Sequence, residues 1–432
     1  MRLNVYSLRD GRRMAGLPFS DLSWSQSWNA AGSMSVTVPV SDGLAGLDLD
    51  GLIVEQQVAL ALLDGDTVIH AGPVLTPPDW DPSSRELSVS CGGGWSMFDW
   101  RLVLDSLLQD RVIDSELLID EDNPGSEWTV AYQGTPGDIV RSLIQLTKRW
   151  GDLPVDVSEF DGSQSTTVQW DGWEFPVMGS VFSELLDTEN GGQLRFDPYI
   201  TVDGRLRWRE RWSLTGVTDR EHAFQWNDGM PDQRAKFTGL SGGDEFWADE
   251  VWMSGGRSDD VLIMTRQRDD DALGTTGLLW QYGNTNTADS MAGLHSAARA
   301  RLNASRRDRS WGFQVGRELL PRVGDRVEFR VNDPYLHAWK ADGTRIGTVV
   351  PLIVTDVSGD ASSEWLDVSC RQCGDVVNGV RSSVMNPLDL MTRRLKRVES
   401  DTRRANSATR SQTYQVVRKL SDIRGGSRGL AV

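Results

Sequence analysis

The chain has 432 residues and a formal net charge of −17, and 39% of its residues are hydrophobic while 25% are charged. This length predicts two to four folding units, and the composition is that of a globular protein, which excludes a disordered chain. No stretch approaches the roughly 18–20 consecutive apolar residues of a membrane span. The N-terminal MRLNVYSLRDGRR has no apolar core behind its charges, so we expect synthesis in a cytoplasm without a secretory signal.

Four segments of the first hundred residues are predicted strands. Residues 34–40 (MSVTVPV) alternate apolar and small polar side chains, which is the pattern of a half-buried strand. Asp64-Gly65 is typical of a tight hairpin turn between two of the strands, and the PPDWDP run at 77–82 predicts a loop. The predicted strands are Met34–Val40, Val54–Leu63, Thr67–Leu75 and Glu86–Cys91.

The middle of the chain predicts mixed α and β structure. Residues 135–150 (TPGDIVRSLIQLTKRW) indicate a helix with Pro136 in its first turn and Ile139, Leu143 and Leu146 on one face. We expect further helices at 180–187 and 289–306, the latter with Met291, Leu294, Ala298 and Leu302 along one side. A hairpin is predicted from strands at 193–196 and 205–211, with its turn at Asp203-Gly204.

A second strand region runs from about residue 310 to Cys373. Its predicted strands lie within 323–331, 346–357 and 365–369. The strand that closes it, Trp365–Cys370, shares Leu-x-Val-Ser-Cys with Glu86–Cys91, which closes the first region, and the elements before each motif follow a similar order. We therefore predict two related small β-barrels.

The last segment changes character. Residues 385–432 hold eleven Arg or Lys and four Asp or Glu, a local charge of +7, which leaves −24 for the rest of the chain. Apolar and small residues at a 3–4 spacing predict a heptad helix with a short disordered end, either a trimeric coiled coil or a single helix packed on its own body. The seam that we expect in the trimer consists of Leu388, Met391, Leu395, Val398, Thr402, Ala405 and Val416.

No catalytic motif is recognisable. GxSxG, HExxH, P-loop and dinucleotide fingerprints are missing from the sequence, so we predict no catalytic, cofactor-binding or metal-binding residues and no cofactor. Cys370 and Cys373 form a CxxC without the second pair that zinc needs, and the acidic runs at 120–123 and 269–271 lack the spacing of a calcium loop. Trp170 and Trp173 could stack on sugars, although aromatic packing is favoured.

In the order of these elements the chain resembles the minor tail proteins of siphophages that infect actinobacteria. These are similar to tail-hub, or tail-associated, proteins of the baseplate-hub type. Three strings carry the resemblance, which spans about residues 1–384: Phe19–Val40 (FSDLSWSQSWNAAGSMSVTVPV), Ser183–Trp208, and Leu320–Val327 (LPRVGDRV).

The resemblance implies a mainly β fold with α+β insertions and a homotrimer. Two barrels in each of three copies would match a sixfold tail tube and present threefold symmetry below it. The expected parts are a first hub barrel at 1–105, an α+β domain at 106–225, a connecting α+β domain at 226–309, a second barrel at 310–384, and the basic helix with its end at 385–432.

The implied function is structural and non-enzymatic, at the tail tip of a long-tailed phage virion. The implied partners are two further copies, distal tail or tail-tube proteins, the tape measure protein, and tail-tip or fibre proteins. Viral DNA would pass the acidic body without specific binding, since a net charge of −24 opposes phosphate binding. Two alternatives stay open: a receptor- or carbohydrate-binding tail protein, and a cell-wall hydrolase.

Overall fold

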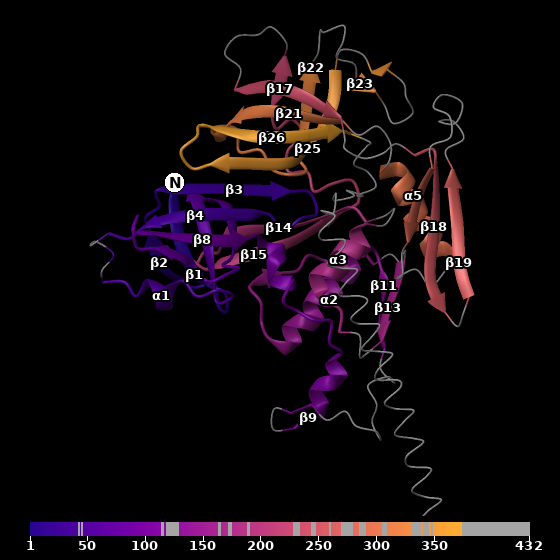
Figure 1. Cartoon of the computed structure of the whole chain (residues 1–432), viewed down its shortest axis with the longest axis horizontal. Helices are drawn as coiled ribbons and strands as arrows, with labels where there is room; N and C mark the ends of the chain where they lie inside the picture. Colours follow the sequence, from indigo (N-terminus) through magenta and orange to yellow (C-terminus); the bar gives the residue numbers. More distant parts are fainter. Residues whose placement is uncertain are drawn as a thin grey trace, which may run out of the picture. The chain divides into compact units, whose positions relative to one another are not determined.

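The structure is a computed structural model. The chain divides into two compact units, Met1–Arg381 and Ser382–Val432, and all residues that the structure describes lie in the first. The described residues are 1–41, 44, 46–113, 116–117, 129–162, 166–171, 175–187, 191–227, 234–242, 248–258, 261–268, 280–284, 291–304, 309–330, 338–339, 345–346 and 349–373. They form a mainly β fold, as the sequence predicts (Figure 1).

A four-stranded antiparallel sheet separates two hydrophobic cores. Its strand order is β2 (Arg13–Leu17), β1 (Arg2–Ser7), β5 (Val58–Asp64) and β6 (Thr67–Pro73). Strand β5 is apolar on both faces: Leu60 and Leu62 belong to the first core, whereas Ala59 and Ala61 belong to the second. The predicted hairpin turn between β5 and β6 is confirmed, with Gly65 at φ +58°.

A second sheet combines strands from both ends of the described chain. Its path is β17 (Ala235–Gly242), β21 (Arg309–Gly316), β26 (Trp365–Gln372), β25 (Val349–Asp360), β3 (Asp21–Ser27), β4 (Ser33–Pro39), β8 (Glu86–Gly92) and β7 (Asp79–Asp81). Two more strands extend it from β25: β22 (Arg326–Arg330), and then β16 (Gln225–Asn227), which runs parallel to β22. The first core lies between this sheet and the four-stranded one.

The prediction of two separate barrels needs correction. No closed barrel is formed in the described part of the chain. Instead β3 pairs with β25, so strands of the two predicted regions form one sheet. Within the first region, the end of β6 is joined to β8 only by an isolated bridge between Val74 and Cys91. The physical reason is that β3 and β25 each have a free edge, and their pairing satisfies the backbone donors and acceptors of both.

The two Leu-x-Val-Ser-Cys segments nevertheless occupy matching positions. In β8, Cys91 is paired with Met34 of β4 on one side and with Val74 after β6 on the other. In β26, Cys370 is paired with Trp311 of β21 and with Val354 of β25 in the same way. Both cysteines are fully buried. The shared motif therefore reflects a repeated strand register.

Two segments predicted to be irregular or connecting belong to the large sheet. Residues 79–81 of the predicted loop form β7, which pairs with the free edge of β8. Strand β17 lies in the expected connecting region 226–309, yet it pairs with β21. Aromatic packing holds it there, because the Phe237 ring lies 4.9 Å from that of Phe329 and 5.6 Å from that of Phe313, between centroids.

The second core is covered by two helices, α2 (Pro136–Trp150) and α3 (Met178–Leu186), which pack against each other (Figure 1). Helix α2 begins as predicted: the Thr135 hydroxyl accepts the Asp138 N–H, and Ile139, Leu143 and Leu146 are buried. The helices lie with the sheet formed by β12 (Val155–Asp156), β15 (Leu206–Ser213) and β14 (Gln193–Ile200), and with the ribbon of β11 (Thr129–Gly134) and β13 (Thr166–Asp171). The predicted turn between β14 and β15 is confirmed, with Gly204 at φ +80°.

A smaller layer follows β17 in the chain. Strands β18 (Glu250–Ser258), β19 (Val261–Arg268) and β20 (Trp280–Asn284) form a sheet that packs against α5 (Met291–Ala304). In α5, Leu294, Ala298 and Leu302 are buried as predicted, but Met291 is 44% exposed because it starts the helix beyond the edge of this contact. The remaining elements are short: α1 (Leu49–Leu52), 3-10 helices at Gly94–Phe98, Ser106–Arg111 and Arg317–Leu319, and the pairs β9 (Val112–Ile113) with β10 (Glu116–Leu117) and β23 (Ala338–Trp339) with β24 (Arg345–Ile346).

Candidate functional site

The LPRVGDRV string forms a turn whose carboxylate, Asp325, is completely buried. Asp325 accepts hydrogen bonds from the backbone N–H of Arg220 at 3.1 Å and of Arg322 at 3.0 Å. The Arg220 guanidinium donates to the same carboxylate at 3.0 and 3.2 Å and also bonds the carbonyl oxygens of Leu319 and Leu320. The turn is therefore fastened to the segment that follows β15.

Gly324 is required by this arrangement. Its φ of +99° is strained for residues with a side chain, and a Cβ at this position would collide with the Val217 carbonyl oxygen. The Gly324 carbonyl in turn accepts a hydrogen bond from the Thr218 hydroxyl at 2.9 Å. We name Val217–Arg220 and Arg322–Asp325, together with Arg195, the polar joint.

Arg195 of β14 connects the joint to the middle of the chain. Its guanidinium donates to the carbonyl oxygens of Val217 and Val323 and pairs with Asp197 and Asp219. Arg211 of β15 pairs with the same two carboxylates. Burial would raise the pKa of Asp219, but hydrogen bonds from Arg211 and Arg195 outweigh it and lower that pKa, so the carboxylate stays charged.

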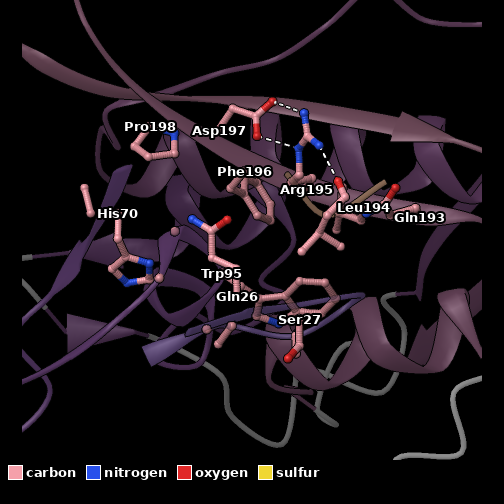
Figure 2. A pocket seen from close by; sticks show the side chains of 17 residues that line it. Gln26, Ser27, His70, Trp95, Gln193, Leu194, Arg195, Phe196, Asp197 and Pro198 are labelled. Carbon is pink, nitrogen blue, oxygen red and sulfur yellow. Dashed lines mark hydrogen bonds and ion pairs between the residues drawn. The ribbon is translucent and has the colours of Figure 1, made fainter. Parts of the chain in front are cut away.

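A cavity of about 60 Å³ lies beside Arg195, where β3, β6 and β14 approach one another. Figure 2 shows His70, Gln26 and the Arg195–Asp197 pair among its lining side chains. Water occupies roughly 30 Å³ in the liquid and drug-sized ligands need roughly 300 Å³ or more. The cavity is thus far smaller than the volume that a drug-sized ligand needs.

His70 is buried at the wall of this cavity. Its Nε2 lies 3.0 Å from the Gly92 carbonyl oxygen, so this nitrogen carries the hydrogen, while Nδ1 has no hydrogen-bond partner among the described residues. Burial lowers the pKa of His70 to about 4, because the charged imidazolium would lose its hydration. The side chain is therefore neutral at physiological pH.

A second buried polar cluster fixes the loop after β12. Arg141 of α2 donates to the fully buried Glu210 of β15 at 3.2 Å and to Asp138 at 3.0 Å. Asp138 also accepts the backbone N–H groups of Asp161 and Gly162. Burial raises the pKa of Glu210, and Arg141 opposes that shift. Each charge has a partner, which is typical of a structural cluster.

The residues singled out from the sequence have different outcomes. The predicted helix seam, Leu388, Met391, Leu395, Val398, Thr402, Ala405 and Val416, lies outside the described residues, as do Trp173 and the acidic runs at 120–123 and 269–271. Trp170 is half-buried against the second core. Cys91, Cys370 and Cys373 form no disulfide, and the described residues contain no group of three His, Cys, Asp or Glu side chains placed to hold a metal ion.

Sequence reasoning missed the polar joint, although its turn was among the strings that carried the resemblance. The signal in the sequence was Val-Gly-Asp, where glycine and a buried aspartate mark a constrained turn. Nothing in the sequence indicated the partners, because Arg220 lies 105 residues before Asp325 and Arg195 lies 128 residues before Val323.

No family model and no curated protein matches the chain by sequence. Solved structures do match. The 43 kDa tail protein of prophage MuSo2 from Shewanella oneidensis has a TM-score of 0.50 at 9% identity, over 88% of this chain and 100% of that one. The chain has the fold of this phage tail protein. The resemblance is thereby confirmed at the level of the fold.

Two further tail proteins are similar at lower scores. Prophage tail protein gp18 from Listeria monocytogenes has a TM-score of 0.48 at 9% identity, over 92% of this chain and 100% of that one. A tail protein from Neisseria meningitidis has a TM-score of 0.47 at 12% identity, over 87% of this chain and 97% of that one.

None of the helices in the described ranges combines the length and apolar character that crossing a membrane requires.

Proposed function

We propose that this chain is a non-enzymatic structural protein of the tail tip of a long-tailed bacteriophage, where three copies form a hub ring. The observation that carries the proposal is the repeated strand register around Cys91 and Cys370. Two similar strand regions in each of three copies would supply six similar units. Such a ring adapts a sixfold tail tube to a threefold tip, since each repeat can meet one tube subunit.

Internal contacts between distant segments support a structural role. The polar joint links residues 195–220 to residues 319–325. Strand β3 near the N-terminus pairs with β25, which lies more than 300 residues later in the sequence. These contacts connect the N-terminal strands, the middle of the chain and the strands of residues 309–373. Rigid spacing of the repeats is what a ring of alternating units requires, and it agrees with the tail-protein fold.

The charge suits passage of DNA through the ring. Outside residues 385–432 the chain carries −24, and we expect a net negative inner wall that repels the phosphate backbone. The other proposed partners are tail-tube proteins above, the tape measure protein in the lumen, and tip or fibre proteins below. The resemblance to minor tail proteins favours a siphophage of an actinobacterial host.

The C-terminal segment completes the proposal. We infer that Leu388, Met391, Leu395 and Val398 form the apolar part of a three-helix seam on the ring axis, with Thr402, Ala405 and Val416 continuing it. Residues 1–105 and 310–384 would form the ring, and residues 106–309 would lie between the repeats in sequence and contact neighbouring tail proteins.

Electron microscopy of the purified chain and of virions tests this function. Class averages should have threefold symmetry with six similar densities, and antibody-bound gold should label the tail tip. A strictly monomeric chain, a ring of another symmetry, or labelling of the capsid or the tail shaft would contradict the proposal.

A further inference from the structure

The path of the large sheet contains two sets of four strands that correspond in order. The first set is β17, β21, β26 and β25, and the second is β3, β4, β8 and β7. Strands β26 and β8 correspond, and their partners agree in register: Gly359 of β25 is opposite Leu366 of β26 as Trp80 of β7 is opposite Leu87 of β8. By their places in the two sets, β7 corresponds to β25 and β17 corresponds to β3.

The turns that end β7 and β25 agree in detail. Asp81, at the end of β7, accepts hydrogen bonds from the backbone N–H of Ser83 at 2.9 Å and from its hydroxyl at 2.7 Å. Asp360, at the end of β25, accepts the same two hydrogen bonds from Ser362 at 2.7 and 2.6 Å. The match of Asp81 with Asp360 supports the correspondence of β7 with β25 independently of the strand ladders.

The two sets are joined by the ladder of β25 with β3, in which Gly359 is opposite Trp24. The strands at the two ends of the path have only one partner each: within the described ranges, β7 pairs with β8 alone and β17 with β21 alone. An unpaired strand edge is a template for another strand. Strand β7 therefore has the place of β25 but no counterpart of β3 beside it, and β17 has the place of β3 but no counterpart of β25.

We propose that β7 pairs with β17 of a second copy, in continuation of the sheet, as β25 pairs with β3 within the chain. Trp24 and Leu240 correspond, because each lies opposite the residue that is paired with a Leu-x-Val-Ser-Cys cysteine. The proposed register is therefore antiparallel, with Trp80 opposite Leu240 of the second copy and Asp79 opposite Ser241 of the second copy.

Side chains at the central position of the ladder support the pairing. Within the chain, a Cβ at Gly359 would lie 3.3 Å from the ring of the buried Trp24, so glycine makes room for the indole. Across the proposed contact the sizes are reversed. Trp80 lies on the core side of the sheet, since it is opposite Leu87, which packs against the first core, yet it is 49% exposed. Leu240, also packed against that core, would give the Trp80 ring a partner.

The contact deepens the proposed hub function, on which it rests, by naming the strands of one interface. It joins one end of the sheet to the other end of the same sheet in the next copy, which makes it heterologous. Contacts of this kind build closed rings when the rotation between neighbours closes, which a self-complementary contact between two copies cannot do. Main-chain hydrogen bonds would supply affinity, and the Trp80 ring would fix the register.

Oxidative cross-linking of the full chain tests the register. Chains with Asp79→Cys are mixed with chains with Ser241→Cys, both in a Cys373→Ser background because Cys373 is half-exposed. We expect a disulfide between the two chains, since directly opposite residues of antiparallel strands lie about 4.5–5.5 Å apart between Cα atoms, within the range that a disulfide spans. Lys236→Cys is the matched control for Ser241→Cys, because it is also exposed on β17 but lies near the other end of that strand. Mass spectrometry of the linked peptides identifies each pair.

Sedimentation velocity measures the contribution of the central side chain. Trp80→Ser should raise the dissociation constant of assembly roughly 30-fold. Trp100→Ser is the control, because Trp100 is 37% exposed and lies outside the strands of the large sheet, and it should leave assembly unchanged.

The inference is overturned by a chain that stays monomeric at high micromolar concentration, by assembly that Trp80→Ser leaves intact, or by cross-linking of Lys236→Cys that equals that of Ser241→Cys. Threefold rings in which Asp79→Cys and Ser241→Cys form no link would sink this interface alone. The expected link in a protein that gold labelling places away from the tail tip would keep the strand pairing and sink the hub function alone.

Discussion

Arg220 and Asp325 are 105 residues apart in the sequence, and the Arg220 guanidinium lies 3.0 Å from a carboxylate that has no exposed surface. The same carboxylate accepts two backbone N–H groups. A buried charge with four donors around it stabilises the fold only while every donor keeps its acceptor.

Asp325→Asn should lower the free energy of unfolding by about 2–4 kcal/mol, because the amide keeps the size of the carboxylate but loses its charge and one acceptor. Urea titration measures the loss. Asp203→Asn is the control, since Asp203 pairs with Arg205 on the exposed β14–β15 turn, where solvent screens an ion pair and its loss changes stability little. Equal losses in the two variants would contradict this account of the joint.

Arg141→Met should cost about 3–5 kcal/mol, because it leaves Glu210 charged and buried without its partner. Burial already raises the pKa of Glu210, and loss of Arg141 should raise it further. Replacing both residues with methionine should cost less than Arg141→Met alone. A double variant that is less stable than the single one would show that the pair itself stabilises the fold.

Stability should fall as the solution is acidified below pH 6.5, in part because of His70. The folded-state pKa of about 4 lies below the ordinary 6.5, so the unfolded chain binds a proton that the folded chain refuses. This contribution is fully present above pH 6.5, falls by about 2 kcal/mol by pH 5, and levels off below pH 4. Comparing wild type with His70→Gln between pH 7 and pH 5 isolates it, and parallel pH profiles would contradict it.

The three thiols should react with alkylating reagents at very different rates. Burial raises the pKa of the Cys91 and Cys370 thiols, whereas Cys373 is half-exposed. Because the thiolate is the reactive form, Cys373 should be modified first in the folded protein, and all three should react in urea. Mass spectrometry of timed samples measures this order.

The purified protein should hold no stoichiometric zinc. Zinc that is present and is lost on replacing Cys370 and Cys373 would overturn that expectation.

A peptide of residues 388–416 should be monomeric and largely unfolded by circular dichroism. Burial of Leu395 against two symmetry-related copies is worth on the order of 2 kcal/mol per chain, which is too little for an isolated basic helix. In the full chain Leu395→Asp should weaken tail-tip assembly without changing the melting of the body. A stably trimeric peptide, or assembly that tolerates the substitution, would contradict the proposed seam.

Local patterns in the sequence predicted the elements whose stability is local. Helix α2 followed from its Thr135 start and from Ile139, Leu143 and Leu146 on one face. The β5–β6 and β14–β15 hairpins followed from Asp-Gly turns. The Leu-x-Val-Ser-Cys match marked two strands, β8 and β26, whose cysteines are both buried, but the two closed barrels predicted from it are not formed in the described residues.

Contacts between distant segments could not be predicted in this way. The pairing of β3 with β25 depends on two free edges that the rest of the fold creates, and no sequence period reports it. Strand β17 joins β21 because Phe237 fits among the rings of Trp311, Phe313 and Phe329. The exposure of Trp280 and Tyr282 could not be predicted from the sequence, because it depends on α5 covering the opposite side of their sheet.

The β3–β25 pairing can form only late in synthesis of the chain. Ser27 pairs with Asp356, which lies 329 residues later in the sequence. At roughly 5–20 residues per second, a ribosome needs about 16–66 s to synthesise the residues between them. During that interval β3 presents an unpaired edge that invites association with other nascent chains. Folding of the N-terminal half is thus provisional until the last strands emerge, and premature termination before residue 349 should yield aggregated fragments.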